Sequence, residues 1–107
     1  MSDAILVMTS KNLSELDHLL SEVKALIARG VHLRFVLFGD AAYSATRDSI
    51  GSTIVHDISP WVEFFVSKQD LKIRGLEAQL ERSVTALDYD EIVDLIMTND
   101  DKVVSYV

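Results

Sequence analysis

The sequence predicts an α/β fold, an open and mostly parallel five-stranded sheet with helices on both faces. Three observations support this prediction. Short apolar runs, typical of buried strands, alternate with segments in which apolar residues recur at helical spacing. Residue types that cap helices stand before several of the helical segments. The chain has 107 residues, the size of one domain, so we expect residues 1–107 to form a single unit.

The first strand and the first helix are predicted between Ala4 and Gly30. Ala4–Met8 is a continuous apolar run, which favours a strand that is covered on both faces. Asn12 or Ser14 can cap the start of the helix that follows, and Gly30 suits its end. The predicted buried stripe of this helix consists of Leu16, Leu19, Leu20, Val23, Leu26 and Ile27.

A second strand is predicted over Leu33–Phe38. Gly39 and Asp40 then form a turn, and Asp40 is the expected N-cap of the next helix. The periodicity of Ser49–Ser59 fits a helix or a strand, and Gly51 interrupts it. We expect a broken helix there, because strands and helices alternate in the rest of the chain.

The third strand is predicted over Val62–Val66, after the break at Pro60. Ser67 with Asp70 forms a capping pair for a short helix that ends at Gly75.

The last strands and helix follow the same rhythm. Val84–Leu87 is the predicted fourth strand, and Asp88 with Glu91 repeats the capping pattern. Asn99 can end the helix, and Val103–Val107 is rich in β-branched residues, which predicts a closing edge strand. The residues expected on the inner face of the helix are Ile92, Val93, Leu95 and Ile96.

The net charge of −7 is distributed unevenly. Residues 55–107 hold eleven acidic and five basic side chains, and residues 88–101 hold six acidic and no basic ones. A phosphate-binding surface needs clustered lysine and arginine, so we expect no direct nucleic-acid binding. We interpret the acidic run as a solvated helix face; the alternative is an edge that attracts a basic partner.

Several chemical signatures are absent from the sequence. There is no cysteine, which excludes a disulfide, a thiolate zinc site and a thiol nucleophile, and is compatible with the cytoplasm. The three histidines lack metal-ligand spacing, and no hydrolase, dinucleotide or P-loop motif occurs. No apolar run is long enough to span a membrane. We expect no cofactor, no metal and no membrane partner, and only an isolated lysine such as Lys68 offers an enzymatic alternative.

Two short motifs in the second half carry a resemblance to a known family. The first is D-L-x-x-R-G, and the second is an apolar run that ends in L-D-Y and enters a helix. The matching residues are Asp70, Leu71, Arg74, Gly75, Leu87, Asp88, Tyr89, Val93 and Leu95. Between Trp61 and Val107 the chain resembles the DsrH/TusB family of small sulfur-relay subunits, which share the DsrE-like fold.

The resemblance implies a flavodoxin-like, DsrE-like sheet with the strand order 2-1-3-4-5. Ligands of such sheets bind beyond the carboxyl ends of the strands. The candidate crevice or interface residues at that edge are Ser10, Gly39, Asp40, Ser67, Lys68, Gln69, Asp70, Arg74, Asp88 and Tyr89.

Each of these residues also has a structural interpretation. We favour helix capping for Asp40, Ser67 and Asp88. The alternative for Ser67 and its two successors is contact with an anion or acyl group at a helix N-terminus. The place of Arg74 in the family motif implies a structural salt bridge or an interface contact.

A relay cysteine occupies the junction of the third strand and third helix in related DsrE-type subunits. The matching place here holds Ser67 and Lys68. Serine cannot carry a persulfide, because that species needs a sulfur nucleophile. The resemblance therefore implies a non-catalytic subunit that works beside DsrE-like and DsrF-like chains. Such complexes serve 2-thiolation of the tRNA wobble uridine or dissimilatory sulfur metabolism.

The alternative function is a stand-alone homo-oligomeric DsrE-like protein that binds a small ligand near Ser10, Asp40 and Lys68. Both hypotheses predict an oligomer. Aromatic residues around Trp61 and the apolar edge strand at the C-terminus present more apolar surface than a small monomer covers easily. The competing outcome is a monomer in which the last helix covers that edge.

Overall fold

The computed structural model describes residues 4–49, 51–98 and 102–106. Within these residues five parallel strands form one sheet: β1 (Ala4–Thr9), β2 (His32–Leu37), β3 (Val62–Ser67), β4 (Val84–Leu87) and β5 (Lys102–Tyr106). The α-helices are α1 (Leu20–Ala28), α2 (Ser52–Ile58), α3 (Lys68–Ile73) and α4 (Tyr89–Thr98). Three 3₁₀ segments complete the connections: η1 (Leu13–Leu19), η2 (Gly39–Ala45) and η3 (Glu77–Gln79). All five predicted strands are confirmed, with ends that differ by one residue at most in the described part.

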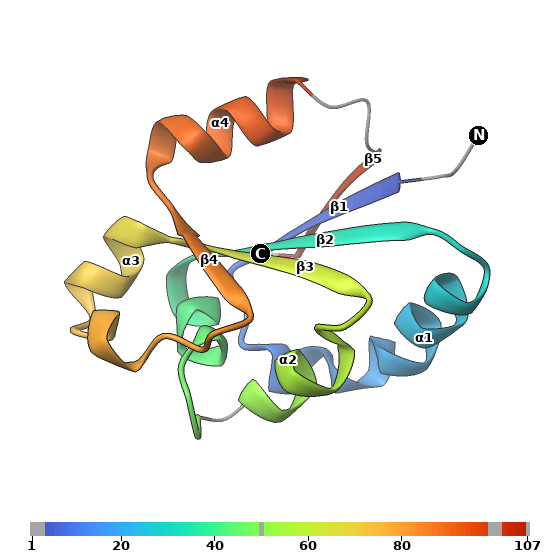
Figure 1. The fold of residues 1–107 in the computed structure, drawn as a ribbon, viewed down its shortest axis with the longest axis horizontal. Coiled ribbons are helices and arrows are strands. Elements are labelled where there is room, and N and C mark those ends of the chain that lie inside the picture. The colour runs from blue at the N-terminus through green and yellow to red at the C-terminus, as the bar shows by residue number, and fades with distance from the viewer. Residues whose placement is uncertain (1–3, 50, 99–101, 107) are drawn as a thin grey trace.

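The strands lie in the order β4-β3-β2-β1-β5, so the predicted order 2-1-3-4-5 is wrong. β3 pairs with β2 rather than with β1, and β5 pairs with β1 rather than with β4, so that Val7 of β1 lies between Phe35 and Val104. The physical reason lies in two connections: the second places β3 beside β2, in the direction in which β2 lies beside β1, and the last returns the chain to β1. Helix α4 carries the chain back across the sheet from one edge to the other, as Figure 1 shows.

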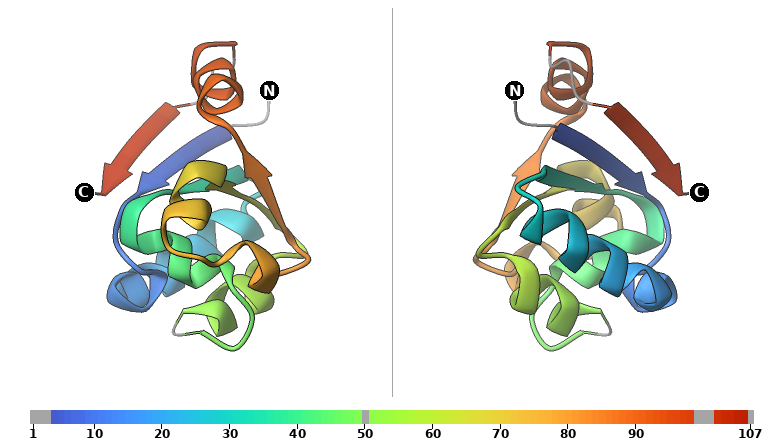
Figure 2. Two further views of the ribbon diagram at one scale, coloured as in Figure 1. Left: turned by 90° about the vertical axis from the view of Figure 1, so that its left-hand side faces the viewer. Right: turned by 90° about the vertical axis from the view of Figure 1, so that its right-hand side faces the viewer.

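The two faces of the sheet are covered unequally. Helices α1 and α2 lie on one side and α4 on the other (Figures 1 and 2). Right-handed crossovers have this effect, because the first three connections step across the sheet in one direction and the fourth returns in the other. The prediction of helices on both faces is therefore confirmed.

The main core lies between one face of the sheet and the helical segments η2, α2 and α3 that cover this face. Phe35 and Phe64 pack there with their ring centroids 5.3 Å apart, and Leu71 joins them from α3. Leu6 and Val36 are also buried, on the opposite face of the sheet by strand alternation. These buried residues on both faces hold the strands in register, and so they hold in place the strand ends where the candidate residues lie.

The first helical segment is less regular than predicted. It begins as the 3₁₀ segment η1, bends at Leu16, and continues as α1. The side chain of Asn12 accepts a hydrogen bond from the backbone N–H of Ser14 at 3.0 Å, which confirms Asn12 as the cap. Gly30 follows the helix with a φ of +82°, as its predicted role requires.

The broken helix expected in Ser49–Ser59 is confirmed as α2, which starts directly after Gly51. A Cβ atom at Gly51 would lie 2.5 Å from Oδ1 of Asn12 and 2.8 Å from Oγ of Ser44. Its φ of +93° also favours glycine. This position therefore joins η1, η2 and α2 at close quarters.

Helix α4 shows one error in the predicted inner face. Ile92, Leu95 and Ile96 are half-buried, but Val93 is 37% exposed. Val93 lies four residues after Tyr89 and so shares a stripe with that exposed residue. The predicted helix end at Asn99 and the last strand residue, Val107, lie outside the described residues.

Candidate functional site

The candidate residues stand at the carboxyl ends of neighbouring strands. Ser10 follows β1, Gly39 follows β2, Ser67 ends β3 and Asp88 follows β4. Because all strands are parallel, these four positions share one edge of the sheet. We call this set of strand ends the carboxyl edge.

The ends of β1 and β2 are packed closely at the carboxyl edge. The carbonyl of Ser10 accepts a hydrogen bond from the N–H of Ala41 at 3.2 Å. The N–H of Ser10 donates to the carbonyl of Tyr106 at 3.0 Å. A Cβ atom at Gly39 would lie 3.4 Å from Cβ of Ser10. Backbone groups that a ligand would need at Ser10 are therefore already used by the protein.

Arg74 is the centre of a small polar cluster at the carboxyl edge. Its guanidinium forms an ion pair with Asp70 at 2.9 Å and with Asp40 at 3.4 Å, and lies over the ring of Tyr43 at 5.9 Å from the centroid. The side chains of Arg74 and Asp70 are only 22% and 24% exposed, whereas that of Asp40 is 80% exposed. We call these four residues the Arg74 clasp, since they join η2 to α3.

The predicted capping role of Asp40 is wrong, and the clasp gives its actual contact. Asp40 lies inside the first turn of η2, where Phe38 holds the N-cap position without a side-chain hydrogen bond. The N–H of Ala41, the third residue of η2, donates to the carbonyls of Ser10 and Phe38. The Asp40 carboxylate is left to bind Arg74.

Ser67 is confirmed as the N-cap of α3. Its hydroxyl accepts a hydrogen bond from the N–H of Asp70 at 3.3 Å, and the residue is 7% exposed. The return bond expected from the Asp70 side chain to the start of the helix is replaced by the ion pair with Arg74. Lys68 and Gln69 are exposed beside this cap.

Asp88 and Glu91 form the complete capping box that the sequence predicts. The carboxylate of Asp88 accepts from the N–H of Glu91 at 2.9 Å, and the Glu91 carboxylate accepts from the N–H of Asp88 at 3.1 Å. Tyr89, which follows this cap, is 65% exposed. The polar contacts at Asp88 serve the helix start and do not reach the Arg74 clasp.

The structure thus brings Asp40, Asp70 and Arg74 together and keeps Asp88 apart. Tyr43 is the member of the clasp that sequence reasoning missed. The available signal was its spacing from Asp40, because residues three apart eclipse each other in a 3₁₀ turn.

An exposed apolar stripe runs along α4. Tyr89, Val93 and Met97 are 65%, 37% and 76% exposed, at a spacing of four residues that places them on one side of the helix. The half-buried residues of α4 occupy the adjoining side. Helix α4 is therefore apolar over more than the face it turns to the sheet, and we call Tyr89, Val93 and Met97 the α4 stripe.

Two cavities lie outside the Arg74 clasp. One is enclosed between α1 and the sheet, and the other is a groove beside Trp61. In residues 4–49, 51–98 and 102–106, no three histidine or acidic side chains gather as a metal site would require. His32 instead approaches Glu63 at 3.0 Å. No helix in the same residues is both long and apolar enough to cross a membrane.

Comparison with known proteins places the sequence in a family. The sequence model of a family described as "DsrH like protein" matches residues 17–102. No curated protein matches the chain.

Two solved structures share the fold. MTH1491 of Methanobacterium thermoautotrophicum, a protein of unknown function, is 18% identical and superposes with a TM-score of 0.78 over 98% of this chain and 99% of that one. The ychN protein of E. coli is 19% identical, with a TM-score of 0.76 over 99% and 100% of the two chains. These similarities establish the α/β fold across the whole chain.

Proposed function

Because the chain belongs to the DsrH-like family, we propose that it is a non-catalytic subunit of a cytoplasmic sulfur-relay complex in which a partner chain supplies the sulfur-carrying thiol. The proposed partners are DsrE-like and DsrF-like subunits. The complex would serve 2-thiolation of the tRNA wobble uridine or dissimilatory sulfur metabolism.

The observation that carries the proposal is the nature of the β3–α3 junction in a chain without cysteine. Ser67 stands there, and its hydroxyl is buried and committed to capping α3. A persulfide forms only on a sulfur nucleophile, so no side chain at this junction can accept one. The position has a structural role in place of a chemical one.

The Arg74 clasp supports the same interpretation of the family motif. Asp70 and Arg74 of D-L-x-x-R-G bind each other at 2.9 Å and hold α3 against η2 through Asp40 and Tyr43. A rigid α3 presents a constant surface to a neighbouring subunit. On that surface Ile73 is 80% exposed, although it is a large apolar residue.

The α4 stripe is the proposed contact with the partner. Transfer of a large apolar side chain from water to an interior contributes about 1.5–3 kcal/mol. Tyr89 and Met97 still expose roughly two-thirds to three-quarters of their surface, so most of that gain remains available to an interface. The acidic side chains of α4 stand beside the stripe and favour a partner with a basic rim.

Co-purification tests the proposal. The tagged chain is expressed with its neighbouring genes, and the recovered proteins are identified by mass spectrometry. We expect a homologous cysteine-bearing chain to co-purify. The double variant Tyr89→Ser with Met97→Ser should lower its recovery at least about tenfold, given two lost apolar contacts.

The matched control is Trp61→Ser. It removes an aromatic residue of similar exposure that directly precedes the amino end of β3. It should leave the complex intact if the contact lies on α4; loss of the partner with Trp61→Ser alone would place the contact at Trp61, on the aromatic surface expected from the sequence. The proposal fails if wild-type chain never recovers a cysteine-bearing partner, or if the stripe variant retains it fully.

A second candidate function uses the same exposed surface. The α4 stripe can also pair two copies of this chain, which is the stand-alone homo-oligomeric alternative. Sedimentation of the pure chain at micromolar concentration separates the two functions. The alternative would be favoured if the pure chain forms a stable homo-oligomer, if the double variant Tyr89→Ser with Met97→Ser is monomeric, and if no partner is recovered from cells.

A further inference from the structure

The cavity between α1 and the sheet is a partly enclosed space that the proposed function does not use. Its volume is about 130 Å³. One wall is formed by the apolar side of η1 and α1, including Leu20 and Val23, and the other by β1, β2 and β5, including Phe35 and Val104. The walls are almost entirely aliphatic or aromatic.

The cavity exists because α1 stands away from the sheet. No residue of α1 is fully buried, although its apolar stripe packs against the core. Beneath it Leu33 and Phe35 are 1% and 5% exposed, so the floor of the cavity is part of the buried core. Val104 and Tyr106 of the edge strand β5 are half-buried and form the side nearest solvent.

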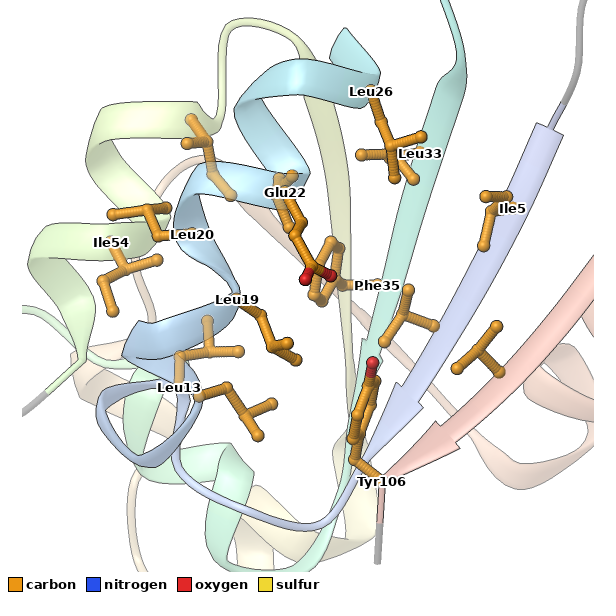
Figure 3. A pocket seen from close by; sticks show the side chains of 15 residues that line it. Ile5, Leu13, Leu19, Leu20, Glu22, Leu26, Leu33, Phe35, Ile54 and Tyr106 are labelled. Atoms are coloured by element: carbon orange, nitrogen blue, oxygen red, sulfur yellow. The ribbon is translucent and has the colours of Figure 1, made fainter.

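Two polar groups face this apolar space. Figure 3 shows the carboxylate of Glu22 and the hydroxyl of Tyr106 pointing into the region between α1 and the sheet. Neither side chain forms a hydrogen bond or an ion pair within the part of the chain that the structure describes. Glu22 itself is exposed, so its carboxylate lies at the mouth.

We propose that this cavity binds a small apolar amine, with a group of about the size of a benzene ring inside and an ammonium at Glu22. Apolar cavities of about 150 Å³ stay dry and accept benzene, which sets the size class. The free carboxylate is complementary to a cation, and the hydroxyl of Tyr106 adds an acceptor. The net charge of −7 further favours a cationic ligand over an anion.

The site is distinct from the α4 stripe, because α1 and α4 lie on opposite sides of the sheet, and its lining includes no residue of the Arg74 clasp. The inference and the proposed subunit role stand or fall independently.

Titration of the full chain with benzylamine, followed by amide chemical shifts in NMR, tests the proposal. Benzyl alcohol is the neutral control with the same ring, and benzoate reverses the charge. We expect saturable shifts at millimolar benzylamine in residues of α1, β2 and β5. Benzyl alcohol should bind about three- to fivefold more weakly, and benzoate should not bind, since the mouth carries a carboxylate.

Two variants locate the ligand. Glu22→Gln keeps the shape of an exposed side chain and should reduce benzylamine affinity to that of benzyl alcohol while leaving benzyl alcohol unchanged. Val23→Phe fills the cavity and should abolish both ligands. If Val23→Phe does not fold, the comparison of ligands on Glu22→Gln still decides the question.

Three outcomes would overturn the inference. The first is an absence of saturable shifts in the lining residues at millimolar benzylamine. The second is shifts confined to the acidic surface of α4, which would show non-specific attraction of a cation. The third is an unchanged benzylamine affinity in Glu22→Gln.

Discussion

Replacing Arg74 by methionine tests the structural role of the D-L-x-x-R-G motif. The substitution keeps an unbranched apolar stem and removes the guanidinium that contacts Asp70, Asp40 and Tyr43. The three contacts differ in burial, so their contributions can be estimated separately and then compared with experiment.

The ion pair with Asp70 is the strongest of the three. It is short, at 2.9 Å, and both side chains are about three-quarters buried, so it contributes about 0.5–1 kcal/mol. The contact with Asp40 is longer and 80% exposed on the acid side, so solvent screening leaves at most about 0.3 kcal/mol. The cation–π contact with Tyr43 adds about 0.5 kcal/mol. Arg74→Met should therefore lower the free energy of unfolding by about 1–2 kcal/mol.

Urea denaturation followed by circular dichroism measures this loss. Asp40→Asn is the matched control and should cost no more than about 0.3 kcal/mol. A double-mutant cycle between Arg74 and Asp70 should give a larger coupling than one between Arg74 and Asp40. If Arg74→Met is as stable as the wild type but loses the partner subunit, the motif is an interface contact and the clasp does not hold α3.

Further substitutions test positions outside the clasp. Gly51→Ala should destabilise the protein by about 2–4 kcal/mol in urea denaturation, because the added Cβ meets polar atoms at 2.5 and 2.8 Å and φ is +93°. Gly30→Ala, with φ of +82° and nothing within 4 Å, should cost only about 1 kcal/mol, and equal losses would contradict the packing at Gly51. Asp88→Ala should cost about 1 kcal/mol by loss of the capping box, with little added by Glu91→Ala, as a thermal melt would show. Lys68→Gln should leave sulfur transfer by the reconstituted complex unchanged, and a large loss would instead favour a nucleophilic lysine.

Features decided by neighbouring residues could be predicted from the sequence. The capping box at Asp88 and the cap at Ser67 depend on spacings of three residues, and both are present. The sequence predicts the five strands because short apolar runs between turn residues are typical of buried strands. The family motif likewise implies a structural salt bridge or an interface contact at Arg74, and the structure contains the salt bridge.

Features that depend on contacts between distant segments could not be predicted from the sequence. The strand order depends on whether β3 pairs with β2 or β1 and on whether β5 pairs with β1 or β4, and an apolar strand fits either neighbour equally well. The clasp required Asp40 and Arg74, 34 residues apart, to meet. A usable signal for the order was β4 itself, whose four residues and exposed Thr85 suit a sheet edge.

The apolar surface of α4 shows a further limit of periodicity. Tyr89, Val93 and Met97 continue the apolar sector of the helix, so the hydrophobic pattern alone assigned Val93 to the inner face. A helix that is apolar beyond the width of its contact with the sheet is typical of an interface, and the pattern cannot separate the two surfaces.

The intact mass of each chain in the purified complex, after incubation with a sulfur donor, tests the central claim most directly. The subunit role predicts that a cysteine-bearing partner gains the mass of one sulfur atom, that a reductant removes it, and that this chain gains nothing. A reducible sulfur adduct on this chain, or sulfur transfer by this chain without any partner, would contradict the account.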